Sequence, residues 1–179
     1  LRSLTPRARP PRISSVPKGP LTKEAARDLL EKTEERDEIV EVFFRFARQY
    51  FDSTVLFTVR EDRAIGLEAH NAPVADIREV SVLFERGGAL DDVMRSLAPR
   101  VVDLSRREVD LHLAHAIGRA QSQPSALVPV CIRQRVVSIV YGDRDSEHFR
   151  IDDVADVIEL LPSVARAFER IIRTRKGFA

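Results

Sequence analysis

Residues 127–144 read LVPVCIRQRVVSIVYGDR, and the fold is inferred outward from this stretch. Two runs rich in β-branched residues, 126–132 and 136–141, are separated only by Arg133, Gln134 and Arg135. Two such runs joined by so short a link predict a β-hairpin, although the link lacks the usual Asn-Gly pair. Pro129 has no amide hydrogen, so we expect either that its strand lies at a sheet edge or that this position is unpaired.

The sequence on both sides of the hairpin indicates a mixture of helices and strands. Downstream, residues 152–175 space their apolar side chains by three and four, which is typical of one long amphipathic helix. Upstream, Thr22 and Asp37 are favourable N-caps for two helices, and Phe46 is expected to face inward from the second. The remaining patterns predict strands at 54–60, 64–69, 77–84 and 101–104, and helices at 90–97 and 106–117, the last capped by Ser105. The fold class is therefore α+β, with helices on the faces of one sheet.

The hairpin resembles the last hairpin of a GAF domain. That family shows a Val-Pro strand, a tight turn, a β-branched strand and a small residue followed by Asp, which match Val128-Pro129 and Gly142-Asp143 here. A long C-terminal helix then follows, and the resemblance covers residues 21–176. It is similar in particular to GAF-like modules of large bacterial signalling chains, sometimes found beside secretion-ATPase N-terminal domains. The resemblance implies a mixed or antiparallel central sheet of five to six strands.

The resemblance also implies where a ligand would lie, which is between the sheet and the helices after the third strand. Arg100, Arg106, His112 and His115 are the polar groups best placed there to meet an anion. The alternative is that Leu97, Leu104, Leu111 and Leu113 fill this space. GAF ligands include cyclic nucleotides, tetrapyrroles and small metabolites, and many members bind nothing known. This sequence lacks the Asn-Lys and Phe-Asp-Glu pattern of cyclic-nucleotide binders, and Cys131 lies inside a predicted strand rather than at a tetrapyrrole attachment point, so we expect no cofactor.

The charge of the chain is unevenly distributed along its 179 residues, although its net value is only +1. Residues 1–20 carry five bases and no acid, residues 166–179 carry five bases and one acid, and the 19 bases and 27 acids between them give −8. Two basic ends on an acidic body suggest contact with something acidic, which could be this protein's own body. No apolar run is long enough to span a membrane, and a single cysteine excludes a disulfide scaffold.

Residues 1–20 are predicted to be a linker or arm, and residues 21–179 a GAF-like domain. Five of the ten prolines lie in the first 20 residues, which favours an extended chain without a core. If the arm docks on an acidic surface, we expect Arg7, Arg9 and Arg12 to make the contact. The chain starts at Leu1 rather than Met, so we expect it to be a fragment of a longer protein or a trimmed chain.

No set of residues indicates catalysis or metal binding. His112 and His115 are three apart, near Glu108 and Asp110, but no third ligand stands at a diagnostic spacing. Gly87-Gly88 is not followed by the residues of a phosphate-binding loop. We therefore expect neither an enzyme nor a metalloprotein.

The end of the C-terminal helix provides the clearest interaction signal. Phe168 and Ile172 extend the apolar stripe beyond the length needed to cover one sheet, and Arg166, Arg170 and Arg173 would surround them. We expect self-association through paired terminal helices. The alternative is that Phe168 and Ile172 pack on the first helix through Leu29 and Leu30.

The sequence thus favours a cytoplasmic, non-catalytic signalling or scaffolding module that binds protein partners and secondarily senses a small ligand. The alternative function is nucleic-acid binding through the two basic ends, and the acidic charge of the folded body argues against it. We expect no membrane partner.

Deleting residues 1–18 is expected to leave folding intact, because the arm supplies no core residue. The shortened chain should unfold cooperatively in urea at the same midpoint as the full chain. A broad or non-cooperative transition would contradict the interpretation of residues 1–20 as a linker.

Overall fold

The structure is a computed structural model that describes residues 19–119, 123–144, 149–175 and 177. The predicted arm, with Arg7, Arg9 and Arg12, lies outside the described residues apart from Gly19 and Pro20. One six-stranded sheet forms the centre, in the order β3-β2-β1-β6-β5-β4, and each neighbouring pair is antiparallel. The strands are β1 (Ser53–Arg60), β2 (Arg63–His70), β3 (Ser81–Leu83), β4 (Arg100–Asp103), β5 (Pro124–Ile132) and β6 (Arg135–Asp143). The predicted α+β class is confirmed. The sequence left open whether the central sheet is mixed or antiparallel, and it is antiparallel.

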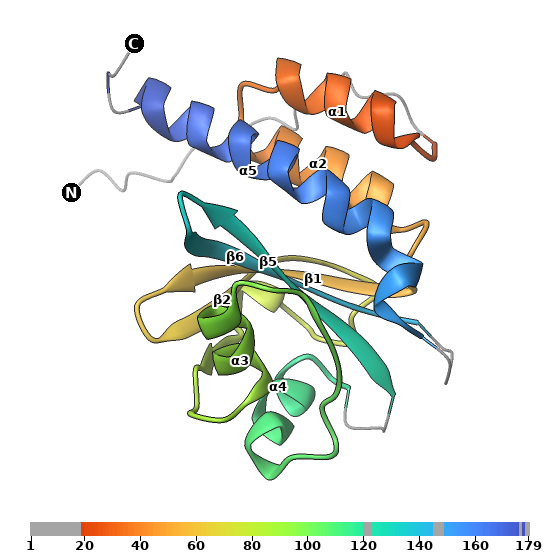
Figure 1. Ribbon diagram of the computed structural model, residues 1–179, viewed down its shortest axis with the longest axis vertical. Coiled ribbons are helices and arrows are strands. Elements are labelled where there is room, and N and C mark those ends of the chain that lie inside the picture. The colour runs from red at the N-terminus through yellow and green to blue at the C-terminus, as the bar shows by residue number, and fades with distance from the viewer. Residues whose placement is uncertain (1–18, 120–122, 145–148, 176, 178–179) are drawn as a thin grey trace, which may run out of the picture.

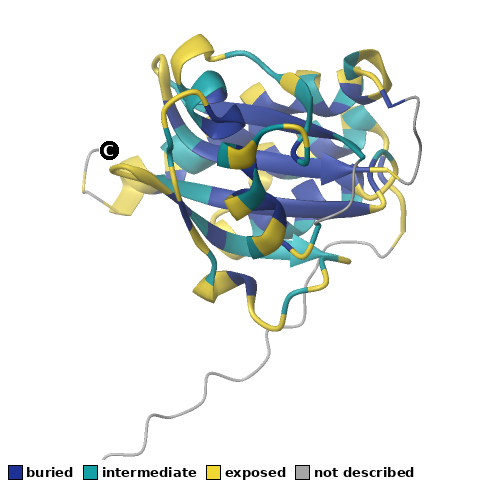
Figure 2. Ribbon diagram, turned by 90° about the horizontal axis from the view of Figure 1, so that it is seen from below, coloured by how far each residue is buried: buried dark blue, intermediate teal, exposed yellow. Residues whose placement is uncertain are grey.

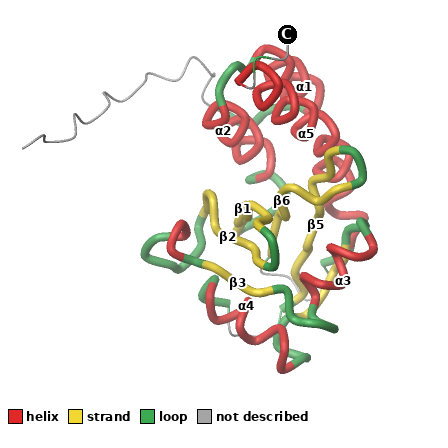
Figure 3. Tube along the Cα trace, turned by 90° about the vertical axis from the view of Figure 1, so that its left-hand side faces the viewer, coloured by secondary structure: helices red, strands yellow, loops and turns green. Residues whose placement is uncertain are grey.

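Helices cover both faces of the sheet. Helices α1 (Lys23–Lys32), α2 (Arg36–Ala47) and α5 (Ala155–Arg175) form a layer on one face (Figure 1). The shorter helices α3 (Ala89–Ser96) and α4 (Leu111–Ala116) lie on the opposite face (Figure 3). In the described part of the chain, no helix is both long enough and apolar enough to cross a membrane.

Polar contacts fasten α1 along α5. Near the start of both helices, Lys23 Nζ lies 2.6 Å from Asp156 Oδ1 and 2.6 Å from Glu159 Oε2. Near their ends, Arg170 Nη2 donates to the carbonyl oxygens of Leu30 (2.7 Å) and Thr33 (2.8 Å). These carbonyls belong to the last turn of α1 and the residue after it, where helix C-termini leave acceptors unsatisfied. The two helices therefore run in the same direction and are joined at both ends.

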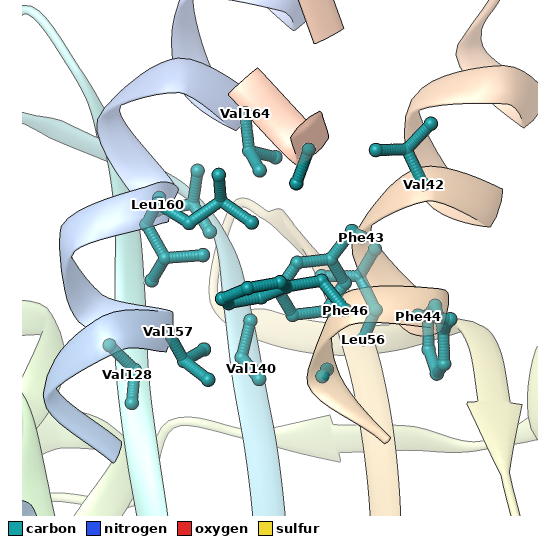
Figure 4. Packing of buried hydrophobic residues seen from close by; sticks show 14 of the residues in the cluster. Val42, Phe43, Phe44, Phe46, Leu56, Val128, Val140, Val157, Leu160 and Val164 are labelled. Carbon is teal, nitrogen blue, oxygen red and sulfur yellow. The ribbon is translucent and has the colours of Figure 1, made fainter. Parts of the chain in front are cut away.

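The sheet separates two hydrophobic clusters, and its central strands are buried on both faces. Alternate residues of β6 face opposite sides, with Val140 toward α2 and α5 and with Ile139 and Tyr141 toward α3 and α4. Figure 4 shows Val140 and Val128 of the sheet beneath Phe43 and Phe46 of α2 and Val157 of α5. In Figure 2 the central strands carry the buried colour, and exposed residues gather on the outer surfaces of helices and loops.

The predicted hairpin is present, and its turn is tighter than the sequence suggested. Ile132 pairs with Arg135, so only Arg133 and Gln134 form the turn. Both have positive φ, 49° and 62°, as a type I′ turn requires. Strand β4 pairs with β5 only between Pro124 and Leu127, so beyond Leu127 no described strand lies on that side of β5. Pro129 therefore occupies a local edge within an interior strand, as expected from its missing amide hydrogen.

Two predicted elements are wrong in type or length, and in both an aspartate explains the difference. Residues 77–84 were expected as one strand, but Ile77–Glu79 is a 3-10 turn whose Arg78 amide donates to Asp76 Oδ1 at 2.9 Å. Residues 106–117 were expected as one helix capped by Ser105. Instead Ser105 donates through its own amide (3.0 Å) and its hydroxyl (2.7 Å) to Asp103 Oδ1, and α4 begins only at Leu111.

The starts of the other helices agree with the sequence analysis only in part, and the long helix expected from residue 152 begins as α5 at Ala155, after a 3-10 turn at Ile151–Val154. Thr22 Oγ1 accepts from the Ala25 amide at 3.1 Å, which confirms the predicted cap of α1. The second predicted cap is wrong by two residues, because α2 starts after Glu35 in a capping box with Glu38. Pro162 lies inside α5, where it lacks the donor for the Ile158 carbonyl, yet α5 continues unbroken to Arg175.

Replacing Phe46 by Ala is expected to destabilise the protein by about 3–5 kcal/mol, the usual cost of truncating a buried aromatic side chain. Phe46 is 1% exposed, and its ring centre lies 5.1 Å from that of Tyr50. Urea unfolding measures the change. The matched control is Arg48→Ala at the exposed end of the same helix, expected to change stability by less than about 0.5 kcal/mol. A loss below about 1 kcal/mol for Phe46→Ala would mean that this helix face is wrongly assigned.

Candidate functional site

The face of the sheet beneath α3 and α4 is where the resemblance places a ligand, and apolar side chains fill most of it. Every side chain of this cluster is buried. The strands contribute Val55, Phe57, Ala64, Val82, Leu127, Val136, Ile139 and Tyr141, and the covering segments contribute Ile77, Ala89, Leu90, Val93, Leu104, Leu113, Ala114 and Ile117. Two of the four leucines expected to fill the space, Leu104 and Leu113, do so. Leu111 is half-buried and Leu97 is exposed, ending α3 with a positive φ.

The four residues predicted to meet an anion are all exposed. Arg106 Nε lies 3.2 Å from Asp103 Oδ2, and His112 Nδ1 lies 2.8 Å from Glu85 Oε1. Arg100 and His115 also point to the surface. Because none of the four is buried on the sheet face, the structure does not bring them together there, and an anion pocket built from them stays a prediction.

Asp110, one of the acids near the two histidines, has a structural role. Asp110 is 3% exposed, and its Oδ1 accepts the amide of Ala89 at 2.6 Å, which caps the first turn of α3 from 21 residues away. No group of three or more His, Cys, Asp or Glu side chains among the described residues is arranged to hold a metal ion. Burial raises the pKa of the Cys131 thiol, so this half-buried side chain is a poor thiolate.

A buried polar cluster, which the sequence analysis did not identify, lies at one end of this face. Tyr141 Oη donates to Asp143 Oδ2 at 2.6 Å and lies 3.1 Å from Ser125 Oγ, while Arg119 Nε lies 3.0 Å from Asp143 Oδ2. The register of β5 and β6 pairs Ser125 with Asp143, and β1 pairs Ser53 with the same residue. The signal in the sequence was the spacing of Tyr141 and Asp143, since residues two apart on a strand share a face.

Burial controls ionisation in this cluster. Asp143 is 1% exposed, and burial raises the pKa of its carboxyl above the ordinary 3.8, although the Tyr141 hydroxyl and the Arg119 charge act in the opposite direction. Burial and the neighbouring Asp143 carboxylate raise the pKa of Tyr141, which therefore stays a neutral donor at physiological pH. The buried hydroxyl of Ser53 has no hydrogen-bond partner in the described structure.

A second feature is an open, partly apolar groove beside the C-terminal half of α5. It consists of two adjoining hollows of about 490 and 640 Å³ that share Ile132, Arg135, Val137 and Ile172. We call it the α5 groove. Its apolar lining is Val59, Leu67, Ile132, Val136, Val137, Phe168, Ile171 and Ile172, and its charged lining is Arg36, Arg60, Arg133, Arg135, Arg173, Arg175, Glu61 and Glu169.

The residues predicted to form a helix interface divide between this groove and the body of the protein. Ile172 is 46% exposed, whereas Phe168 is half-buried against the hydrophobic cluster between the sheet and helices α1, α2 and α5. Arg173 lies 3.0 Å from Glu169 at the edge of the groove. Arg166 donates to Ser163 Oγ at 2.9 Å, and Arg170 is used within the chain to hold α1. Arg170 therefore does not border a free apolar patch as expected.

The architecture is that of a GAF domain. The structure aligns with the GAF domain of a phosphoenolpyruvate-protein phosphotransferase from Coxiella burnetii at a TM-score of 0.70 and 13% identity, covering 88% of this chain and 95% of that one. It also aligns with the GAF domain of a two-component sensor histidine kinase from Bacillus halodurans. The TM-score is 0.66 and the sequence identity 11%, and the alignment covers 80% of this chain and 99% of that one.

A third similar structure is an enzyme. It is the free methionine-R-sulfoxide reductase from Neisseria meningitidis, with a TM-score of 0.68 and 14% identity, covering 85% of this chain and 89% of that one. No protein-family model matches the sequence, and no curated protein matches it. The resemblance to GAF domains seen in the hairpin is thus confirmed at the level of the fold.

The raised pKa of Asp143 predicts an unusual pH dependence of stability. Because the folded state holds this proton more tightly than the unfolded state, the contribution of Asp143 falls as pH rises from its ordinary pKa through the raised one. We expect wild type, compared with Asp143→Asn, to lose unfolding free energy as pH increases above about 4, the ordinary pKa of the carboxyl. Urea unfolding of both proteins at several pH values gives the difference. A difference that is constant, or that grows with pH, would show that Arg119 keeps the carboxyl ionised.

Proposed function

We propose that this protein is a non-catalytic signalling module that acts in the cytoplasm by binding another protein through the α5 groove. The observation that carries the proposal is the exposed apolar floor of that groove. Ile172 is among the few large hydrophobic side chains with more than a third of their surface exposed, and it stands beside half-buried Phe168, Ile132 and Val137. A contiguous apolar patch surrounded by polar residues is typical of an interaction surface.

The chemistry of the opposite face supports a non-catalytic role. The space beneath α3 and α4 is occupied by aliphatic and aromatic side chains rather than by an acid–base pair. Reduction of a sulfoxide, the activity named for one similar structure, needs a source of two electrons. The single cysteine here is half-buried with a raised pKa, which makes it a weak nucleophile.

Sensing of a small ligand is the second candidate, and one observation favours it. The buried cluster of Ser125, Tyr141 and Asp143 lies on the face where the resemblance places GAF ligands, and the nearby Ser53 hydroxyl is buried without a partner. A small polar molecule or an ordered water would satisfy that hydroxyl. We rank it second because apolar side chains occupy most of the surrounding space.

The proposal predicts that a photo-reactive side chain at position 172 will cross-link to a protein in the cells that make this chain. The matched control is position 83, because Leu83 is also a large exposed hydrophobic residue (49%) but lies on the edge strand β3, away from α5. We expect one defined adduct, identified by mass spectrometry, from position 172 and from position 137 in the groove, but not from position 83.

Binding of the purified partner must then weaken at least about tenfold in Ile172→Ala, the loss typical of truncating a central apolar contact. Adducts that are the same at positions 83 and 172, or no adduct at position 172, would refute the proposal. Unchanged circular dichroism and melting temperature show that Ile172→Ala remains folded.

A further inference from the structure

The charges around the α5 groove identify the kind of partner that it fits. Six arginines and two glutamates line the groove, a local charge of +4, whereas the other residues of 21–179 carry 18 bases and 26 acids, a charge of −8. The groove is thus a basic region on an acidic body. An approaching acidic segment would be attracted here and repelled elsewhere on the body, which gives both orientation and selectivity.

Several of these arginines are available to a partner. Arg60, Arg135 and Arg175 are exposed and make no side-chain hydrogen bond or ion pair with any other residue that the structure describes. Arg133 and Arg173 are 72% and 57% exposed and share the single carboxylate of Glu169, at 2.9 and 3.0 Å. One carboxylate neutralises only one of two cations, so this pair retains a net positive charge.

The same charges argue against a second copy of this chain as the occupant. A twofold dimer places the same patch of both subunits against each other. Six arginines and two glutamates would then face an identical set, which is repulsive at the short range where salt does not screen. The expectation of self-association through the terminal helix is therefore not favoured for this groove.

The apolar floor argues against nucleic acid. Phosphate binding needs cations and hydrogen-bond donors, and single-stranded bases are held by stacking on aromatic rings. The groove presents Ile132, Val137 and Ile172, which are aliphatic, and its one ring, Phe168, is half-buried in the core cluster. Aliphatic side chains next to arginines suit an amphipathic peptide instead.

We infer that the α5 groove binds an acidic amphipathic segment of another protein, with its apolar side chains on Ile132, Val137 and Ile172 and its carboxylates on the surrounding arginines. This inference rests on the proposed function and specifies the partner. Guanidinium groups match carboxylates with two parallel hydrogen bonds, so aspartate and glutamate are the expected acids.

Three labelled peptides of about 16 residues, long enough for marginal helicity, test the inference. All share one apolar face of leucine and alanine, and their polar positions are all Glu, all Gln or all Lys. Fluorescence anisotropy with the full chain is expected to give the tightest binding for the Glu peptide, at least about tenfold tighter than for the Gln peptide, and none for the Lys peptide. Binding of the Glu peptide should weaken with added salt, because exposed ion pairs are screened.

Charge reversal in the groove and at a remote site forms the matched pair of variants. Arg60→Glu/Arg135→Glu should weaken binding of the Glu peptide at least about fivefold, because each substitution removes an attraction and adds a repulsion. Arg86→Glu/Arg95→Glu reverses two exposed arginines, one on α3 and one in the loop that leads into it. Because α3 lies on the other face of the sheet, this variant should leave affinity unchanged within about twofold. Ile172→Ala should also weaken the Glu peptide.

Other outcomes would overturn the inference. Equal binding of the Glu and Gln peptides would show that charge has no role. Tighter binding of an oligothymidylate that depends on Arg60 and Arg135 but not on Ile172 would identify a nucleic-acid surface. If the wild-type protein sediments as a dimer and the Arg60→Glu/Arg135→Glu variant sediments as a monomer, the occupant of the groove is a second copy of this chain. If position 172 cross-links to a protein while the Glu peptide does not bind, the proposed function stands and only the acidic partner is wrong.

Discussion

The burial of three neighbouring strands on both faces is the constraint on which the rest of the structure depends. Strand β6 sends Val140 into one hydrophobic cluster and Ile139 and Tyr141 into the other, and β1 and β5 flank it in the same way. Since a shift of register by one residue would exchange these faces, the pairing of β6 with both neighbours is strongly specified. Each face must then be covered separately. The helical layer of α1, α2 and α5 covers one face, and α3, α4 and their connecting segments cover the other.

Close packing against the sheet also determines single residues of the hairpin. A Cβ on Gly142 would collide with the ring of Phe51, which packs directly on that position of β6. Only glycine fits there. The neighbouring Asp143 is buried on the opposite face, where it contacts Tyr141 and Arg119. The pair Gly142-Asp143, which first suggested a family in the sequence, thus has two physical causes, a close approach on one face and a buried polar cluster on the other.

The sequence predicted elements whose determinants are local and missed those determined by distant contacts. Thr22 caps α1 through a residue three positions away, and the hairpin follows from two adjacent β-branched runs, so both were predicted. Helix α3 is capped by Asp110, and the polar cluster forms only when β5 and β6 bring Ser125 beside Tyr141. Such pairs cannot be inferred without the register. Asp76 and Asp103 differ from both groups, because their effect is local and was still missed. Each accepts hydrogen bonds from residues two positions later, and these bonds replace the start of the expected strand and helix.

The contacts of Lys23 and Arg170 have a mechanical consequence for the chain as a whole. They join α1 and α5 near both ends, so separating the two helices would require both sets of contacts to break. The described chain begins at Gly19, which accepts a hydrogen bond from Arg45 of α2, and α5 ends at Arg175 beside the groove. Both ends thus leave from the same helical layer (Figure 1). A force applied at either terminus would therefore pass through α1 and α5 rather than across the sheet, and polypeptide attached at the two ends would be coupled through this pair of helices.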